Sequence, residues 1–187
     1  MIKQSRSVVV VGYIGNKGTA VLADNFKEKI EAHYPLYLCR EAMSFGEDLG
    51  NVAESMTKIV AAHFEECGCE KQILEIGEGG LLTALWNLGK EYGCGYELDL
   101  RKIPIRQETI EICELLAVNP YHLCSYGALI TIVPEGQVLV EKLTALGINA
   151  VSVGRTNDTK AHILNNDGTV SHINRPEPDE LVRLGLI

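Results

Sequence analysis

The residues whose types and spacing could do chemistry lie in one stretch, residues 73–81. A short apolar segment, Ile73–Ile76, is followed by three glycines within four residues. These are Gly77, Gly79 and Gly80, and a helical pattern starts directly after them. A glycine turn that leads into a helix gathers unpaired backbone N–H groups and the positive end of the helix dipole, which together attract phosphate. The spacing is neither a Walker loop nor a dinucleotide fingerprint, so a tight turn that needs glycine only for backbone geometry stays open as the alternative.

Two glutamates, Glu75 and Glu78, accompany these glycines. A carboxylate beside a phosphate raises the Coulomb energy unless a Mg²⁺ ion bridges the two. Their simpler interpretation is that they complement the positive helix terminus. A second polar group, His122 with Cys124 and Ser125, could supply a nucleophile and a base. No Gly-x-Ser-x-Gly elbow and no positioned acid accompany it, so we expect an ordinary polar loop and no catalysis by this chain alone.

Composition restricts the class of protein. The chain has 187 residues, of which 46% are hydrophobic and 22% charged, as in soluble globular proteins. The net charge of −8 opposes binding to nucleic acid or to an anionic membrane. The apolar runs are too short to span a bilayer and there is no signal peptide, so we expect a cytoplasmic protein. The six cysteines are scattered, and Cys67-Gly68-Cys69 lacks the spacing of a zinc site, so we expect no metal site.

Strand and helix patterns alternate along the chain, which predicts a single α+β domain, residues 1–187, with a mixed sheet covered by helices. The Asp167-Gly168 pair predicts a hairpin turn near the end. Residues 36–48 show no clear period and are expected to be loop or partly helical. The expected strands are residues 7–11, 73–76, 96–100, 128–133, 150–154, 161–164 and 169–173. The expected helices are residues 19–32, 51–67, 81–92, 107–117, 135–146 and 179–184.

The order of these motifs resembles the C-terminal domain of the AIR synthase-related (PurM-like) superfamily, and most of all its hydrogenase-maturation carbamoyl dehydratase branch. That branch opens with Gly-x-Ile-Gly-x-His-Gly and a helix of small apolar residues, and this chain has Gly12-Tyr13-Ile14-Gly15-Asn16-Lys17-Gly18. Where the branch has Asp-Pro-Thr-Arg-Gly-Gly-Leu, this chain has Glu75-Ile76-Gly77-Glu78-Gly79-Gly80-Leu81. Where it has Asn-Glu-Gly before a strand, this chain has Ser125-Tyr126-Gly127.

The resemblance implies a PurM C-terminal-domain-like sandwich whose glycine turn faces a nucleotide cleft between two domains. It makes Glu75, Gly77, Glu78, Gly79, Gly80, Ser125, Tyr126 and Gly127 the candidate ligand- or phosphate-binding residues. Enzymes of this family use ATP, and an N-terminal domain supplies most of their Mg-binding and dimer-forming residues. We expect that domain to be absent here, because the chain begins on the first strand of the C-terminal domain. The resemblance therefore implies ATP and Mg²⁺ only with a partner domain.

Three departures from the family pattern matter for chemistry. Glu78 stands where the branch has arginine, and Tyr126 stands where it has glutamate. The last residues, 183–187, lack the reactive cysteine of the branch. We therefore expect a ligand- or partner-binding protein that is not catalytic by itself. The alternatives are one subunit of a split ATP-dependent enzyme, with its N-terminal domain on another chain, and an independent small enzyme. Residues 34–48 are apolar for a loop, which predicts a covered face or a homodimer contact.

Overall fold

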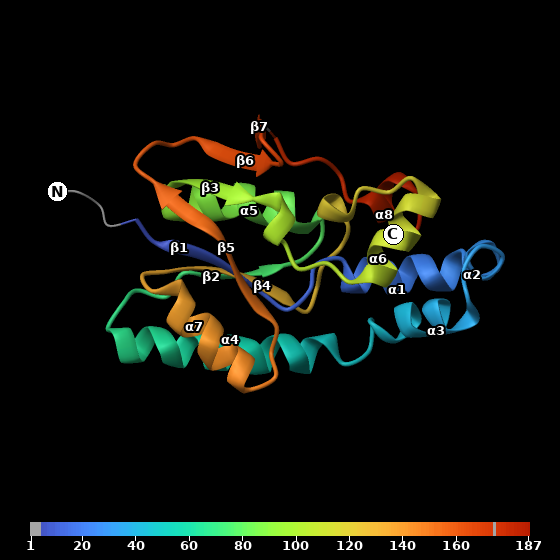
Figure 1. Ribbon diagram of the computed structural model, residues 1–187, viewed down its shortest axis with the longest axis horizontal. Helices are drawn as coiled ribbons and strands as arrows, with labels where there is room; N and C mark the ends of the chain where they lie inside the picture. The colour runs from blue at the N-terminus through green and yellow to red at the C-terminus, as the bar shows by residue number, and fades with distance from the viewer. Residues whose placement is uncertain (1–4, 174) are drawn as a thin grey trace.

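A mixed β-sheet runs through the middle of the protein in a computed structural model that describes residues 5–173 and 175–187 (Figure 1). Within these residues the strand order is β2-β4-β1-β5-β3-β6-β7. The strands are β1 (Ser7–Val11), β2 (Ile73–Ile76), β3 (Gly95–Asp99), β4 (Ala128–Val133), β5 (Ala150–Asn157), β6 (His162–Asn166) and β7 (Thr169–His172). Strand β1 is buried along its whole length, as its run of β-branched valines predicts.

Neighbouring strands are antiparallel except for β3 and β6, which are parallel. The predicted hairpin is confirmed: β6 and β7 pair antiparallel, and Asp167 and Gly168 both have positive φ between them. The loops before α1, before α5 and before β4 all meet at one end of the central strands. That end holds the candidate site.

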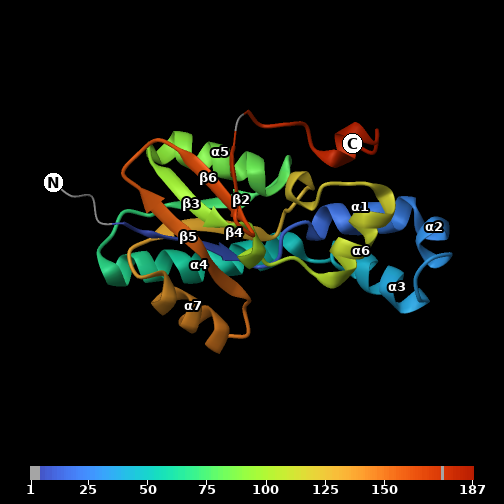
Figure 2. The ribbon, with the colours of Figure 1, turned by 45° about the horizontal axis from the view of Figure 1, so that its top comes forward.

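Helices cover both faces of the sheet and extend beyond one end of it. Helix α5 covers one face, α4 and α7 cover the other, and α1, α2, α3 and α6 pack together beyond the end of the sheet where these loops meet (Figures 1 and 2). The helices are α1 (Asn16–Asn25), α2 (Lys27–Glu31), α3 (Leu36–Ser44), α4 (Leu49–Cys67), α5 (Gly80–Tyr92), α6 (Gln107–Leu116), α7 (Gly136–Ala145) and α8 (Glu180–Arg183). The prediction of a mixed α/β fold is confirmed.

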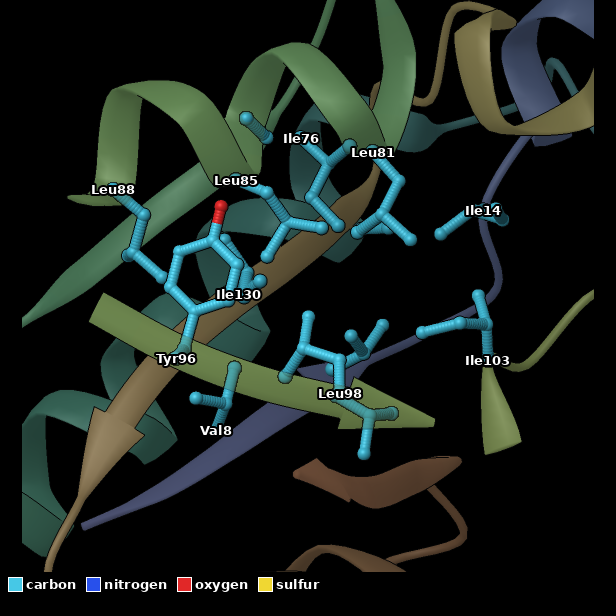
Figure 3. Close-up of a cluster of buried hydrophobic side chains, with 14 of the residues drawn as sticks. Val8, Ile14, Ile76, Leu81, Leu85, Leu88, Tyr96, Leu98, Ile103 and Ile130 are labelled. Carbon is cyan, nitrogen blue, oxygen red and sulfur yellow. The ribbon is translucent and has the colours of Figure 1, made fainter. Parts of the chain in front are cut away.

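The core under α5 fixes the position of the glycine turn. Figure 3 shows Leu81, Leu85 and Leu88 of α5 pointing at side chains of the sheet, among them Tyr96 and Ile130. Each of these leucines is fully buried, and burying one such side chain contributes about 2 kcal/mol. The first turn of α5 is therefore anchored firmly, and the turn that precedes it is anchored with it.

The helix predicted over residues 19–32 is wrong in its length. Two helices, α1 and α2, occupy this stretch, and Phe26 separates them with φ −116° and ψ 25°. The side-chain N–H of Asn25 donates to the carbonyl of Val21 at 2.8 Å. A side chain that bonds the backbone of its own helix competes with the helical hydrogen bonds, and this one lies directly before the break.

Residues 36–48, expected as loop or partly helical, contain helix α3. Pro35 precedes it with φ −58° and ψ 145°, a conformation suited to the entry of a helix. Leu38, Cys39 and Ala42 are spaced three or four residues apart and are buried against α1. The period was hidden because Leu36 and Tyr37, also apolar, lie on the exposed side.

Candidate functional site

The structure brings the two predicted segments, residues 75–80 and 125–127, together at one end of the sheet. The carbonyl of Gly77 accepts the backbone N–H of Ser125 at 3.1 Å. The backbone N–H of Gly127 donates to Glu75 Oε1 at 3.3 Å. A Cβ added to Gly77 would lie 2.9 Å from the ring of Tyr126. The two segments thus form one continuous surface.

Packing accounts for the glycines in this turn. Gly79 and Gly80 have φ of +76° and +64°, which side chains rarely adopt. A Cβ on Gly80 would lie 2.6 Å from the carbonyl oxygen of Tyr121 and 2.8 Å from backbone atoms of Leu123. A Cβ on Gly79 would lie 2.4 Å from Thr83 Oγ1. These contacts favour the tight-turn interpretation of the glycine pattern.

A carboxylate of the chain itself occupies the anion position of the turn. The backbone N–H of Gly79 donates to Asp179 Oδ2 at 2.7 Å, and Asp179 Oδ1 accepts the N–H of Leu181 at 2.9 Å. Asp179 is only 2% exposed. The backbone N–H of Gly79, which a phosphate at the turn would need, is therefore already bonded to a buried negative charge. Asp179 was not among the predicted site residues, although an aspartate before the short final helix is a capping signal.

The exposed side chains around the turn add negative charge. Glu75 and Glu78 are both exposed, and Tyr126 is 45% exposed beside them. No cationic group from this chain forms an ion pair with either glutamate among the described residues. The exposed rim of the turn is therefore acidic.

Ser125 positions two loops relative to each other. It is fully buried, and its hydroxyl donates to the carbonyl of Leu123 at 2.7 Å and accepts the backbone N–H of Gly15 at 2.7 Å. Nearby, the backbone N–H of Gly18 donates to the carbonyl of Cys124 at 2.8 Å. Ser125 thus links the glycine loop before α1 to the loop that packs on the turn before α5.

The polar group around residue 122 does not form a nucleophile–base pair. Cys124 is buried, and burial raises the pKa of its thiol to about 11. Ser125 Oγ is bonded to backbone groups, as described above. His122 Nε2 lies 3.6 Å from a carboxylate oxygen of Glu177, not beside either nucleophile. Residues 5–173 and 175–187 also contain no cluster of three His, Cys, Asp or Glu side chains that could hold a metal ion.

A pocket of about 600 Å³ lies beside this surface and was not expected from the sequence. Its walls are the loop before α1, the junction of α3 and α4, and residues 147–149, and Gly127 connects it to the turn. In its lining, the guanidinium of Arg106 lies between two rings, 4.5 Å from the centroid of Tyr13 and 4.6 Å from that of Phe45. These three residues are far apart in sequence, so no local pattern announces the arrangement.

The fold and these loops define a known class of domain. The profile of the family described as "AIR synthase related protein, C-terminal domain" matches residues 7–165, and the chain belongs to that family. A carbamoyl dehydratase HypE of Rhodobacter capsulatus is 28% identical over 152 residues, which are 79% of this chain and 40% of that protein. The chain thus spans about two-fifths of that relative.

Solved structures show the same fold. The hydrogenase maturation protein HypE of E. coli aligns with 98% of this chain and 54% of its own, with a TM-score of 0.68 and 16% identity. A HypE structure in complex with ATP aligns with 94% of this chain and 52% of its own, with a TM-score of 0.65 and 15% identity. No helix in the described part of this chain is long and apolar enough to cross a bilayer.

Proposed function

We propose that this domain is a non-catalytic binding module whose glycine-turn surface docks a second domain. The hydrogen bond from Gly79 to the buried carboxylate of Asp179 carries the proposal. It occupies one of the N–H groups that a phosphate at the turn would need. The surface then consists of two exposed glutamates, Glu75 and Glu78, and the exposed ring of Tyr126. The loops that carry these side chains are joined by hydrogen bonds. Such a surface suits a partner better than a bare phosphate.

Electrostatics support the need for a partner. A triphosphate at the turn would approach Glu75, Glu78 and Asp179, and each pair of like charges 4 Å apart costs about 4 kcal/mol near a protein surface. A bridging Mg²⁺ would remove that cost, but Mg²⁺ requires an octahedral set of oxygens. On this proposal the partner contributes the missing ligands, so ATP and Mg²⁺ bind only after it has docked.

Isothermal titration with ATP and Mg²⁺ tests this function. The domain alone is expected to give no heat of binding, and the Glu78→Arg variant is expected to gain weak phosphate binding because it reverses the charge beside the turn. Glu91→Arg, which changes an exposed glutamate near the other end of α5, is the matched control. Micromolar binding of ATP–Mg²⁺ to the unmodified domain alone would overturn the proposal.

The alternative is a subunit of a split ATP-dependent enzyme. It is favoured by the observation that this chain aligns with only about half of the HypE chain solved with ATP. Co-purification with a separately encoded, acidic domain, followed by an ATPase measurement on the mixture, separates the two functions. Activity in the mixture and none in either part supports the split enzyme, and a stable complex without ATPase activity supports the binding module.

The oligomeric state and location belong to the same proposal. Leu36 and Tyr37 of α3 are 54% and 69% exposed, which supports a homodimer contact there, while Leu38 and Phe45 of the same segment are buried in the chain's own core. Size-exclusion chromatography of Tyr37→Glu against the parent chain tests the contact, and a strict monomer in both refutes it. None of the six cysteines, all in the described part, forms a disulfide, which supports a cytoplasmic location.

A further inference from the structure

We propose that the pocket beside the loop before α1 binds a small zwitterion of the α-amino acid class. Arg106 would hold its carboxylate, and Glu47 and Asp48 would face its ammonium group. The site is separate from the glycine turn and does not depend on the docking proposed there. Its volume of about 600 Å³ lies in the range of small-molecule sites in proteins.

Arg106 is a fixed cation without a polar partner. Its guanidinium carbon lies over the rings of Tyr13 and Phe45, 4.5 and 4.6 Å from their centroids, and these contacts restrain its position. Within the described residues its side chain makes no hydrogen bond and no ion pair, and its Nε is buried and unpartnered. A guanidinium held in this way presents its N–H groups edge-on, the geometry that binds a carboxylate through two hydrogen bonds.

Three acidic side chains line the same pocket, but none of them forms an ion pair with Arg106. Glu41, Glu47 and Asp48 are all in the lining, and none of them forms an ion pair with Arg106 at 4.0 Å or less. The carboxylate of Asp48 accepts a hydrogen bond from Asn51, so it is held in place. Positive and negative groups therefore line one cavity without pairing with each other.

This separation selects the charge pattern of the ligand. A simple anion would be drawn to Arg106 but repelled by three carboxylates, and a simple cation would leave the guanidinium unmatched. A molecule with both charges satisfies both sides. The wall also offers Asn16, whose side-chain oxygen is buried without a partner. The free energy lost through that unmade hydrogen bond is regained if a ligand N–H reaches it.

Ligand-observed NMR with pooled L-amino acids on the whole chain, followed by titration of each one that binds, tests the proposal. At least one amino acid is expected to bind with a Kd of about 1 mM or tighter. Its N-acetyl derivative, which lacks the cation, and its decarboxylated amine, which lacks the anion, are each expected to bind roughly tenfold more weakly or worse. No binding by any amino acid, or equal binding by either analogue, overturns the zwitterion assignment.

Two variants locate the binding. Arg106→Met keeps an unbranched side chain between the rings and is expected to abolish binding, whereas Arg40→Met, at an exposed arginine of α3 outside the pocket lining, is expected to leave it unchanged. If Arg106→Met fails to fold, the double variant Glu47→Gln with Asp48→Asn supplies the test, because it removes the ammonium side without touching the stacked arginine. Unchanged binding in a folded variant of either kind overturns the site.

Discussion

The two glycine loops of this domain lie on either side of Ser125 and differ in what surrounds them. In the turn before α5, the N–H of Gly79 is bonded to the buried Asp179, and the exposed rim is acidic. In the loop before α1, the backbone is also satisfied internally, through Gly12 to Asn149 and Gly15 to Ser125. The second loop lines a pocket that also contains Arg106. Glycines therefore do not mark a ligand site here; the side chains gathered around them do.

The largest expected effect is the loss of stability in Gly80→Ala, which tests whether close packing requires glycine in the closed turn. The new Cβ would lie 2.6 Å from the carbonyl oxygen of Tyr121, and the loss of stability is expected to be on the order of 4 kcal/mol. Gly93→Ala is the control, since it has a similar φ of +60° with no atom within 4 Å and should cost about 1 kcal/mol. Urea unfolding measures both. Equal losses would show that backbone strain alone, not packing, fixes the turn.

The next effect is that of Asp179→Ala, which removes the acceptor of Gly79 and the cap of α8 together. We expect a loss of about 3 kcal/mol, because a buried N–H is left unpaired and a helix cap is lost. Asp24→Ala, at an exposed position of α1, should change stability by less than about 0.5 kcal/mol. If Asp179→Ala loses as little stability as Asp24→Ala, the turn does not need the carboxylate of Asp179.

Ser125→Ala tests the link between the two loops. It leaves the N–H of Gly15 without its partner in the interior, so a loss of about 2 kcal/mol is expected. Amide hydrogen exchange should then speed up in both loops and not only in the nearer one. Faster exchange confined to residues 12–18 would show that the loops are independent.

A fall in pH is expected to destabilise the packing against α5, the helix that follows the closed turn. His162 packs on Gly89 of α5 and stacks on Tyr96 at 4.6 Å, and burial lowers its pKa below the ordinary value. The unfolded chain therefore binds the proton more readily, so stability falls as the pH drops below about 6.5. The free energy of unfolding is expected to differ less between neutral and mildly acidic pH in His162→Phe than in the parent chain. His63, whose pKa is also lowered by burial, contributes in the same direction. An unchanged difference would exclude His162 as a source.

The smallest effect concerns thiol reactivity beside Ser125. Cys67 is exposed and should react quickly with a disulfide reagent, whereas burial and the raised pKa of about 11 protect Cys124. In Asp179→Ala, Cys124 should become reactive as the turn opens. Peptide mass spectrometry after partial labelling identifies each thiol, and early labelling of Cys124 in the parent chain would contradict the closed turn.

Local patterns predicted most of the fold because its elements follow clear periods. The valine run of β1 and the Asp167-Gly168 turn each contain their signal within a few residues. The break at Phe26 was not predicted. Residues 36–48 were predicted as loop or partly helical, because exposed apolar residues obscured the period of the helix after Pro35. Of the candidate site, the meeting of residues 75–80 with 125–127 followed from the family resemblance.

The two residues that set the chemistry of the site could not be found in the same way. Asp179 meets Gly79 across one hundred residues, and Arg106 meets Tyr13 and Phe45 from a separate loop. Each contact is created by the tertiary fold, and neither side of it carries a pattern of its own. Single-sequence reasoning thus located the turn but could not show that its N–H was already bonded.

The bond between Gly79 and Asp179 also orders events during synthesis. Its two halves are separated by one hundred residues, and closing so long a loop is slow compared with forming the helix and strand beside the turn. A nascent chain that has not yet reached residue 179 holds Gly79 with its N–H unpaired. During synthesis the N–H of Gly79 therefore cannot gain this partner until residue 179 has been made, although the strand and helix beside the turn are complete by residue 92.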